Sequence, residues 1–150
     1  MPISDLFSGT AGYYARFRPA YPEELLRELV DRAHGVEKGL VDLGCGTGEL
    51  SIPLSQHFPT VLAVDTDPEM ISAAREKARS LGVDNIRWMV SRAEDVELRE
   101  ASCNLITAGA SFHWMDRAVM APRCREAEQL PPAALQPLPR QQPPAARAPP

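Results

Sequence analysis

The feature that most constrains this chain is a short apolar run, Leu40 to Leu43, that passes directly into the glycine-rich loop GCGTG. A four-residue run entered from Gly39 and left through glycines suits a buried strand of a parallel sheet. Glycines at positions 44, 46 and 48 allow the backbone to turn tightly and to approach a ligand without side-chain obstruction. The sequence therefore predicts a strand, a turn and a helix, with a ligand site at the turn.

Helices and strands are expected to alternate along the rest of the chain. The patterns predict helices from Pro22 to near Gly35, from about Gly48, and from the capping residue Asp67 to Gly82. Pro53 is expected to kink or destabilise the second helix. Further strands are predicted over residues 61–64, 85–90 and 103–107. This order predicts an α/β fold, a Rossmann-like parallel sheet of about four strands with helices on both faces, and it places the glycine loop at a topological switch point.

Two acids flank the loop and bear on which ligand it holds. Asp42 precedes the glycines and Glu49 follows them. Two unit charges about 4 Å apart interact by about 4 kcal/mol at an effective dielectric constant near 20, so these acids disfavour the pyrophosphate of a dinucleotide. The glycine spacing also differs from the GxGxxG pattern of nicotinamide-dinucleotide sites. A phosphate-free ligand with sulfonium and ammonium groups, such as S-adenosylmethionine, would instead be attracted.

A third acid, Asp65, lies at the end of the predicted strand 61–64, 21 residues after Gly44. A carboxylate at this place can accept hydrogen bonds from both hydroxyls of an adenosine ribose. Because nicotinamide-dinucleotide sites share this feature, Asp65 predicts an adenosine ligand without deciding between the two cofactors.

Four segments in order resemble the successive motifs of class I S-adenosylmethionine-dependent methyltransferases, of the small-molecule group called methyltransferase type 11. The segments are VDLGCGTGEL, VLAVDTDPEMISAA, SRAEDVEL and LITAGASFHWMD, and the leading FSGTAGYYARFRPAYPEELL is similar to the segment before the core in that group. The resemblance covers roughly residues 7 to 118. It implies that S-adenosylmethionine is the cofactor and that no metal is required.

The resemblance also implies roles for individual residues. The methionine part of the cofactor is expected against Asp42 and the loop from Gly44 to Gly48, and the ribose against Asp65. Adenine is expected against Thr66, with Ala93 and Glu94 near its exocyclic edge. The cofactor-binding residues predicted in this way are Asp42, Gly44, Cys45, Gly46, Gly48, Asp65, Thr66, Ala93 and Glu94.

His113 follows the last predicted strand, where the methyl acceptor is expected to arrive. A histidine there can take a proton from the acceptor, which makes His113 the candidate catalytic residue; the alternative is a histidine that packs or hydrogen-bonds at the mouth of the site. By resemblance, Tyr13, Tyr14, Arg16 and Arg18 are candidates for a lid over the cofactor.

Charge and cysteine content restrict partners and location. A formal net charge of −4 gives no electrostatic reason to expect nucleic acid, although it does not exclude RNA or DNA as a substrate. The resemblance to the small-molecule group implies a small-molecule acceptor. The chain has no stretch of roughly 18 apolar residues and no apolar run of the signal-peptide kind near its start, so neither a membrane partner nor export is expected. Three cysteines without CxxC spacing predict neither a disulfide framework nor a zinc site, and a cytoplasmic location is expected.

The sequence changes character at Ala121. Residues 121–150 hold nine of the fifteen prolines and no aromatic residue, which predicts a disordered tail after a cofactor-binding core in residues 1–120. Members of the group usually continue through a fifth strand and an antiparallel pair, so a frameshift or truncation is expected, with self-association through the exposed sheet edge.

Three functions follow from these patterns. The first is methyl transfer from S-adenosylmethionine to a small molecule. The second is a catalytically inactive remnant or a module that only binds S-adenosylmethionine. The third is an NAD-dependent oxidoreductase, which the loop spacing and its acids disfavour.

Overall fold

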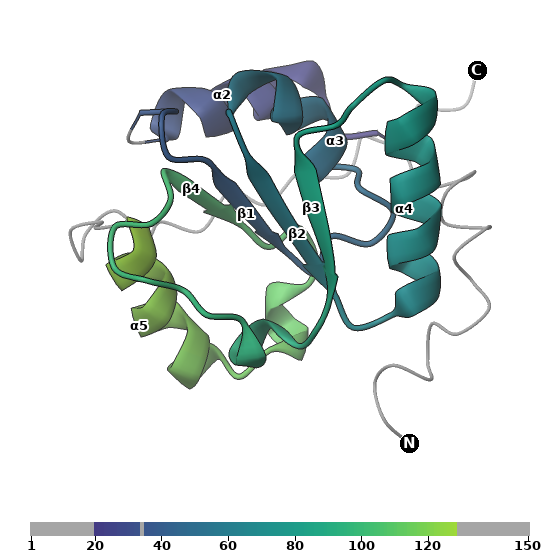
Figure 1. Cartoon of the computed structure of the whole chain (residues 1–150). Coiled ribbons are helices and arrows are strands. Elements are labelled where there is room, and N and C mark those ends of the chain that lie inside the picture. The colour runs from purple at the N-terminus through teal and green to yellow at the C-terminus, as the bar shows by residue number, and fades with distance from the viewer. Residues whose placement is uncertain (1–19, 34, 129–150) are drawn as a thin grey trace, which may run out of the picture.

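A computed structural model describes residues 20–33 and 35–128 of the chain. Four parallel strands form one sheet in the order β3-β2-β1-β4 (Figure 1). The strands are β1 (Leu40–Leu43), β2 (Val61–Asp65), β3 (Ile86–Val90) and β4 (Leu105–Thr107). The predicted Rossmann-like parallel sheet is therefore confirmed, and the strand order reverses beside β1, where the glycine loop begins.

Helices cover both faces of this sheet. The helices are α2 (Glu23–Arg32), α3 (Ser51–Leu54), α4 (Pro68–Ser80) and α5 (Arg117–Glu128), with short 3-10 turns η2 (Ser55–His57), η3 (Ala93–Asp95) and η4 (Phe112–Trp114). Alternate residues of β1 serve the two faces, since Leu40 packs with α2 and α3 while Val41 and Leu43 pack with α5. This alternation is what a strand buried on both faces requires.

The helix α4 follows its sequence signals closely. The side chain of Asp67 accepts a hydrogen bond from the backbone N–H of Glu69 at 2.8 Å, and Pro68 occupies the first turn. Gly82, just after the helix, has a φ of +70°, which glycine adopts without steric cost. The predicted start and end of this helix are confirmed.

The helix after the glycine loop is shorter and begins later than predicted. It starts at Ser51 rather than near Gly48 and ends at Leu54, where the 3-10 turn η2 follows. Pro53 therefore lies in the first turn of α3, where proline is tolerated in a helix. A helix of four residues has no second segment that Pro53 could kink, and the expected cost in stability stays a prediction.

The expected boundary of a disordered tail at Ala121 falls inside α5. Residues 121–128 belong to this helix although Pro122 lies within it and removes one backbone hydrogen bond. Met120, Cys124 and Ala127 are buried against the sheet, and this burial offsets the cost of the proline. The rest of the predicted tail lies outside the described residues.

The end of α5 lies against the chain that leads into the edge strand β4. The carbonyls of Glu126 and Ala127 accept hydrogen bonds from the N–H groups of Ala101 and Cys103, at 2.9 Å and 3.3 Å. The buried carboxylate of Glu128 accepts a hydrogen bond from the N–H of Ile106. Part of the edge that the sequence leaves open is thus covered by the chain itself.

Within residues 20–33 and 35–128, no helix is both long and apolar enough to cross a membrane. The same residues contain no cluster of three or more histidine, cysteine or acidic side chains that suits a metal ion. Cys45, Cys103 and Cys124 are all free thiols.

Candidate functional site

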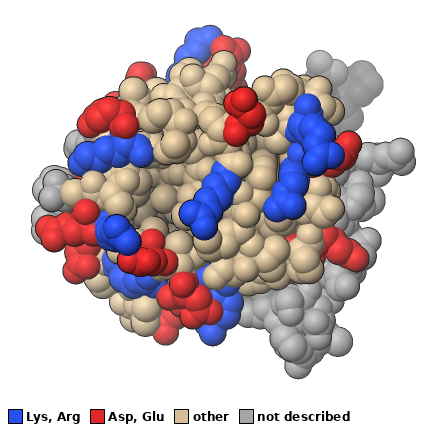
Figure 2. Space-filling view, viewed as in Figure 1, with Lys and Arg blue, Asp and Glu red and all other residues tan. Residues whose placement is uncertain are grey.

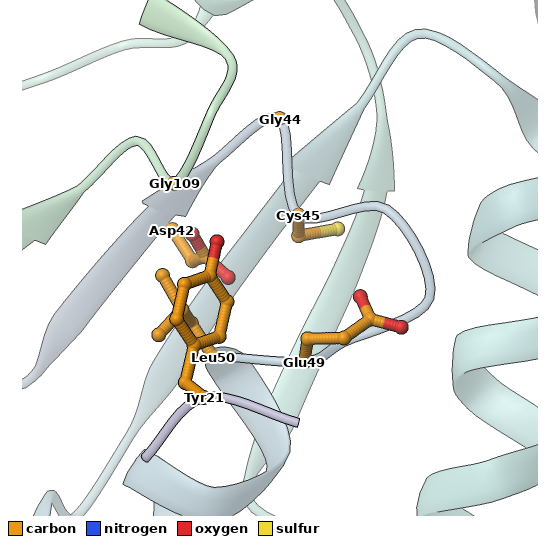
Figure 3. A pocket seen from close by; sticks show the side chains of 7 residues that line it. All are labelled: Tyr21, Asp42, Gly44, Cys45, Glu49, Leu50 and Gly109. Carbon is orange, nitrogen blue, oxygen red and sulfur yellow. The ribbon is translucent and has the colours of Figure 1, made fainter. Parts of the chain in front are cut away.

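The candidate site is a pocket at the carboxyl end of the sheet, beside the loop that joins β1 to α3. Three predicted residues line it, namely Asp42, Gly44 and Cys45 (Figure 3). The remaining lining residues are Tyr21, Glu49, Leu50 and Gly109. The pocket therefore lies at the switch point that the strand order creates.

Asp42 lies in β1 and is almost completely buried, with 1% of its surface exposed. Its two carboxylate oxygens accept hydrogen bonds from the hydroxyls of Ser51, at 2.5 Å, and Thr107, at 2.9 Å. Ser51 opens α3 and Thr107 is the partner of Asp42 in β4, so this carboxylate joins three elements. Burial raises the pKa of Asp42 to about 6, while the two hydroxyl hydrogen bonds act in the opposite direction.

Asp65 ends β2 and lies beside the same loop. Its carboxylate accepts one hydrogen bond from the N–H of Gly46 and another from the N–H of Asp67, each at 2.9 Å. Burial raises its pKa, and these backbone hydrogen bonds partly offset the effect. The structure thus brings Asp65 to the glycine loop, as its position at a strand end predicts.

Two glycines allow segments from distant parts of the chain to meet at the pocket. Gly44 has a φ of +69°, and a Cβ atom there would lie 2.4 Å from the Cβ of Ser111. A Cβ atom at Gly109 would lie 2.7 Å from the Tyr21 hydroxyl oxygen and 2.7 Å from Leu50. Any other residue would push these walls of the pocket apart.

Glu49 lies near the end of the loop, two residues before α3, and is also buried, with 8% of its surface exposed. Its Oε1 accepts a hydrogen bond from the hydroxyl of Thr47. Its Oε2 is buried and has no hydrogen-bond partner among the described residues. Figure 3 shows the Glu49 side chain inside the arc of the loop.

The thiol of Cys45 is not suited to act as a nucleophile. Burial raises its pKa, and the neighbouring carboxylates of Asp42 and Asp65 raise it further. Cys45 therefore serves as a small side chain in the wall of the pocket.

The other predicted cofactor residues do not line this pocket. Gly48 lies in the buried loop, Thr66 is exposed just after β2, and Ala93 is buried in η3. Glu94 makes contacts that the sequence did not indicate: its carboxylate accepts a hydrogen bond from the N–H of Asp116 at 2.8 Å and lies 3.6 Å from Arg92. The hydrogen bond from Asp116 is the main reason that the pKa of Glu94 is lowered.

His113, the candidate catalytic residue, lies in η4 and is exposed. Its ring packs 4.8 Å from the ring of Trp114, centroid to centroid, and it does not line the pocket. Tyr13, Tyr14, Arg16 and Arg18, the candidate lid residues, lie outside the described part of the chain.

Sequence analysis missed Tyr21, Ser51, Thr107 and Ser111. The hydroxyl of Ser111 donates to the carbonyl of Leu43 at 2.7 Å and thereby holds the segment after β4 against the glycine loop. A polar residue at the end of the predicted strand 103–107 was a usable signal for Thr107. No local signal identifies Tyr21, because its partners are remote in the sequence.

The chain is similar to known methyltransferases. A family model described as "Methyltransferase domain" matches residues 40–130. The "Probable S-adenosylmethionine-dependent methyltransferase CRG1" of Saccharomyces cerevisiae is 30% identical over 106 residues, which is 69% of this chain and 36% of that protein. "Trans-aconitate 2-methyltransferase" of Rhodococcus jostii is 37% identical over 90 residues, 58% of this chain and 34% of that protein.

A solved structure of a "Putative Type II Methyltransferase" from Anaeromyxobacter dehalogenans superposes with a TM-score of 0.62 at 32% identity. That match covers 74% of this chain and 44% of the solved one. The chain thus spans less than half the length of each of these three proteins.

Proposed function

Because the chain belongs to the family of class I S-adenosylmethionine-dependent methyltransferase domains, we propose that it binds S-adenosylmethionine at the carboxyl end of its sheet and serves methyl transfer to a small-molecule acceptor. The observation that supports this most is the pocket beside the glycine loop, where the carboxylates of Asp42 and Glu49 are both buried. No Lys or Arg from the described residues lines it. An anionic pocket of this kind favours a cationic methyl donor over a diphosphate.

The proposed contacts follow the placement of the predicted residues. The amino-acid end of the ligand is assigned to the β1 end and the loop, the ribose to Asp65, and the adenine to the residues after β2 and β3. In full, these residues are Asp42, Gly44, Cys45, Gly46, Gly48, Asp65, Thr66, Ala93 and Glu94. The hydrogen bond between Gly46 and Asp65 supports this assignment, because it holds the loop next to the proposed ribose position.

When bound, S-adenosylmethionine supplies a methyl group from its sulfonium sulfur, and the sulfur becomes a neutral thioether once the methyl group is transferred. The residues of this chain contribute by aligning the methyl group with the acceptor atom, and a loop held in one position provides this alignment. Asp42 ties the loop to α3 and β4, and Ser111 ties it to the segment after β4. His113 is proposed to take a proton from an acceptor that must lose one, and its exposed place on η4 leaves it open to a molecule arriving from solvent.

Charge supports a small acceptor over a polyanion. The chain carries a net charge of −4, and on the face shown in Figure 2 the basic and acidic side chains are intermixed. Nucleic-acid partners generally require a continuous basic surface. The name of the Rhodococcus jostii relative, trans-aconitate 2-methyltransferase, is that of an enzyme with a small organic acid as acceptor.

Thermal melting and calorimetry of the full chain test the binding proposal. We expect S-adenosylhomocysteine to raise the melting temperature, because a ligand at 100 times its Kd stabilises a fold by about 2.7 kcal/mol. Calorimetry should show heat with S-adenosylmethionine and none with NADH. Heat from NADH together with none from S-adenosylmethionine would overturn the proposal in favour of an oxidoreductase.

A turnover assay separates the enzyme from a module that only binds. Radiolabelled S-adenosylmethionine is incubated with the chain and a panel of small organic acids, and S-adenosylhomocysteine release is measured. Binding without release under any condition would favour the second function and contradict methyl transfer by this chain.

A further inference from the structure

We propose that Glu49 accepts a hydrogen bond from the α-ammonium group of S-adenosylmethionine. This inference rests on the proposed function and deepens it, because it names the side chain that recognises the amino-acid end of the ligand. Neither the spacing of the glycines nor the resemblance assigns this role to Glu49.

The first support is an acceptor atom without a donor. Glu49 is more than nine-tenths buried, and its Oε2 has no hydrogen-bond partner among the described residues. Its Oε1 is already used by the hydroxyl of Thr47. A buried carboxylate oxygen left unpaired costs free energy, so a ligand that supplies a donor at this place offsets the cost.

The second support is the contrast with Asp42, the other acid of the pocket. Both oxygens of Asp42 already accept a hydroxyl, from Ser51 and from Thr107. Figure 3 shows Asp42 on the strand beside Tyr21, whereas Glu49 lies inside the arc of the loop. Asp42 thus holds the scaffold together, while Glu49 retains an oxygen for a ligand.

The third support is uncompensated negative charge. None of the ion pairs found among the described residues involves Asp42, Glu49 or Asp65. Burial is the main cause of the raised pKa of Asp42, and the charges of Glu49 and Asp65 add to it, so these carboxylates repel one another. A bound cation relieves that repulsion.

The ligand carries two cationic groups, and hydrogen bonding distinguishes them. An ammonium has three N–H donors, whereas a sulfonium has none. An oxygen that lacks a donor is therefore matched by the ammonium, and the sulfonium gains only the general attraction of the acidic pocket.

The variant Glu49→Gln tests this with the full chain and three ligands in calorimetry. S-adenosylmethionine and S-adenosylhomocysteine both carry the ammonium, and 5′-methylthioadenosine lacks it. We expect Glu49→Gln to weaken binding of the first two by about 10- to 100-fold, the range of a charge-assisted hydrogen bond, and to leave the third unchanged. Glu24→Gln, at an exposed acid on α2, is the matched control and should change none of them.

Each other outcome has a definite meaning. Unchanged affinity for S-adenosylmethionine, or a loss restricted to S-adenosylmethionine, would overturn the ammonium contact. An equal loss for all three ligands would also overturn it, because Glu49 would then support the loop rather than the ligand. Glu49→Asp keeps the charge and should restore part of the affinity. A wild-type chain that binds none of the three ligands would instead refute the proposed function itself.

Discussion

Asp42 is a buried carboxylate in the centre of the fold, and none of the ion pairs among the described residues involves it. Its hydroxyl partners come from positions 9 and 65 residues away, in α3 and β4. A carboxylate held this way has two consequences. It fixes the geometry of the loop, and it makes the ionised state costly until a cation arrives.

The variant Asp42→Asn should make the pH dependence of stability visible. The folded state holds the Asp42 proton up to a pKa of about 6, whereas the ordinary pKa of an aspartate is 3.8, so raising the pH through this window destabilises the wild type. The amide of the variant does not titrate, and the carboxylates of Glu49 and Asp65 no longer face the charge of Asp42. The variant should therefore gain about 3 kcal/mol in unfolding free energy, relative to wild type, between about pH 3.5 and about pH 7.5. Urea unfolding at both pH values measures it, and a difference that does not vary with pH would contradict the raised pKa.

Some site residues were predictable from local sequence, and others were not. The glycine loop and Asp65 are recognisable because a strand end fixes their place, and the structure joins them through Gly46. Tyr21 gives no such signal, since it meets the pocket through a glycine 88 positions further along the chain, Gly109. The lining of a pocket by remote segments is a property of the tertiary fold, and a local pattern does not carry it.

At the scale of elements, prediction succeeded where one signal dominated and failed where signals competed. The cap at Asp67 and the stop at Gly82 defined α4 correctly. In α5 the proline content predicted disorder, but burial of Met120 and Cys124 against the sheet prevails over Pro122. Composition averages over a window, whereas packing depends on which side chains share a face.

Met120→Ala tests whether α5 is part of the core. Met120 is fully buried, so truncation should lower the unfolding free energy by about 2 to 5 kcal/mol. Val119→Ala is the control, because 45% of the Val119 surface is exposed and its loss should change stability little. Equal effects of the two variants in urea unfolding would show that the helix does not pack as described.

For the molecule as a whole, the motif order was enough to predict the sheet and its switch point. The sequence did not indicate that the end of α5 folds back onto the chain before β4. That contact depends on the length and direction of the connection after η4. The expected self-association through the edge of β4 therefore stays a prediction about the part of the edge that α5 leaves uncovered.

Sedimentation equilibrium over a wide concentration range tests this association. If copies pair through β4, the apparent mass should rise above the 16.5 kDa of one chain as concentration increases. Added S-adenosylhomocysteine should not dissociate the assembly, because none of the residues that line the pocket belongs to β4. A single species of 16.5 kDa at every concentration would contradict it.

The strand order β3-β2-β1-β4 also dictates when the pocket can form on the ribosome. β1 is made first among the strands, yet one of its two neighbours is translated last, some 65 residues later. In a nascent chain, β1 can pair with β2, and β2 with β3, before β4 has been synthesised. The second carboxylate oxygen of Asp42 can accept its hydrogen bond only after Thr107 has been added. The lining of the pocket, which includes Gly109, is consequently complete only after β4 has been synthesised.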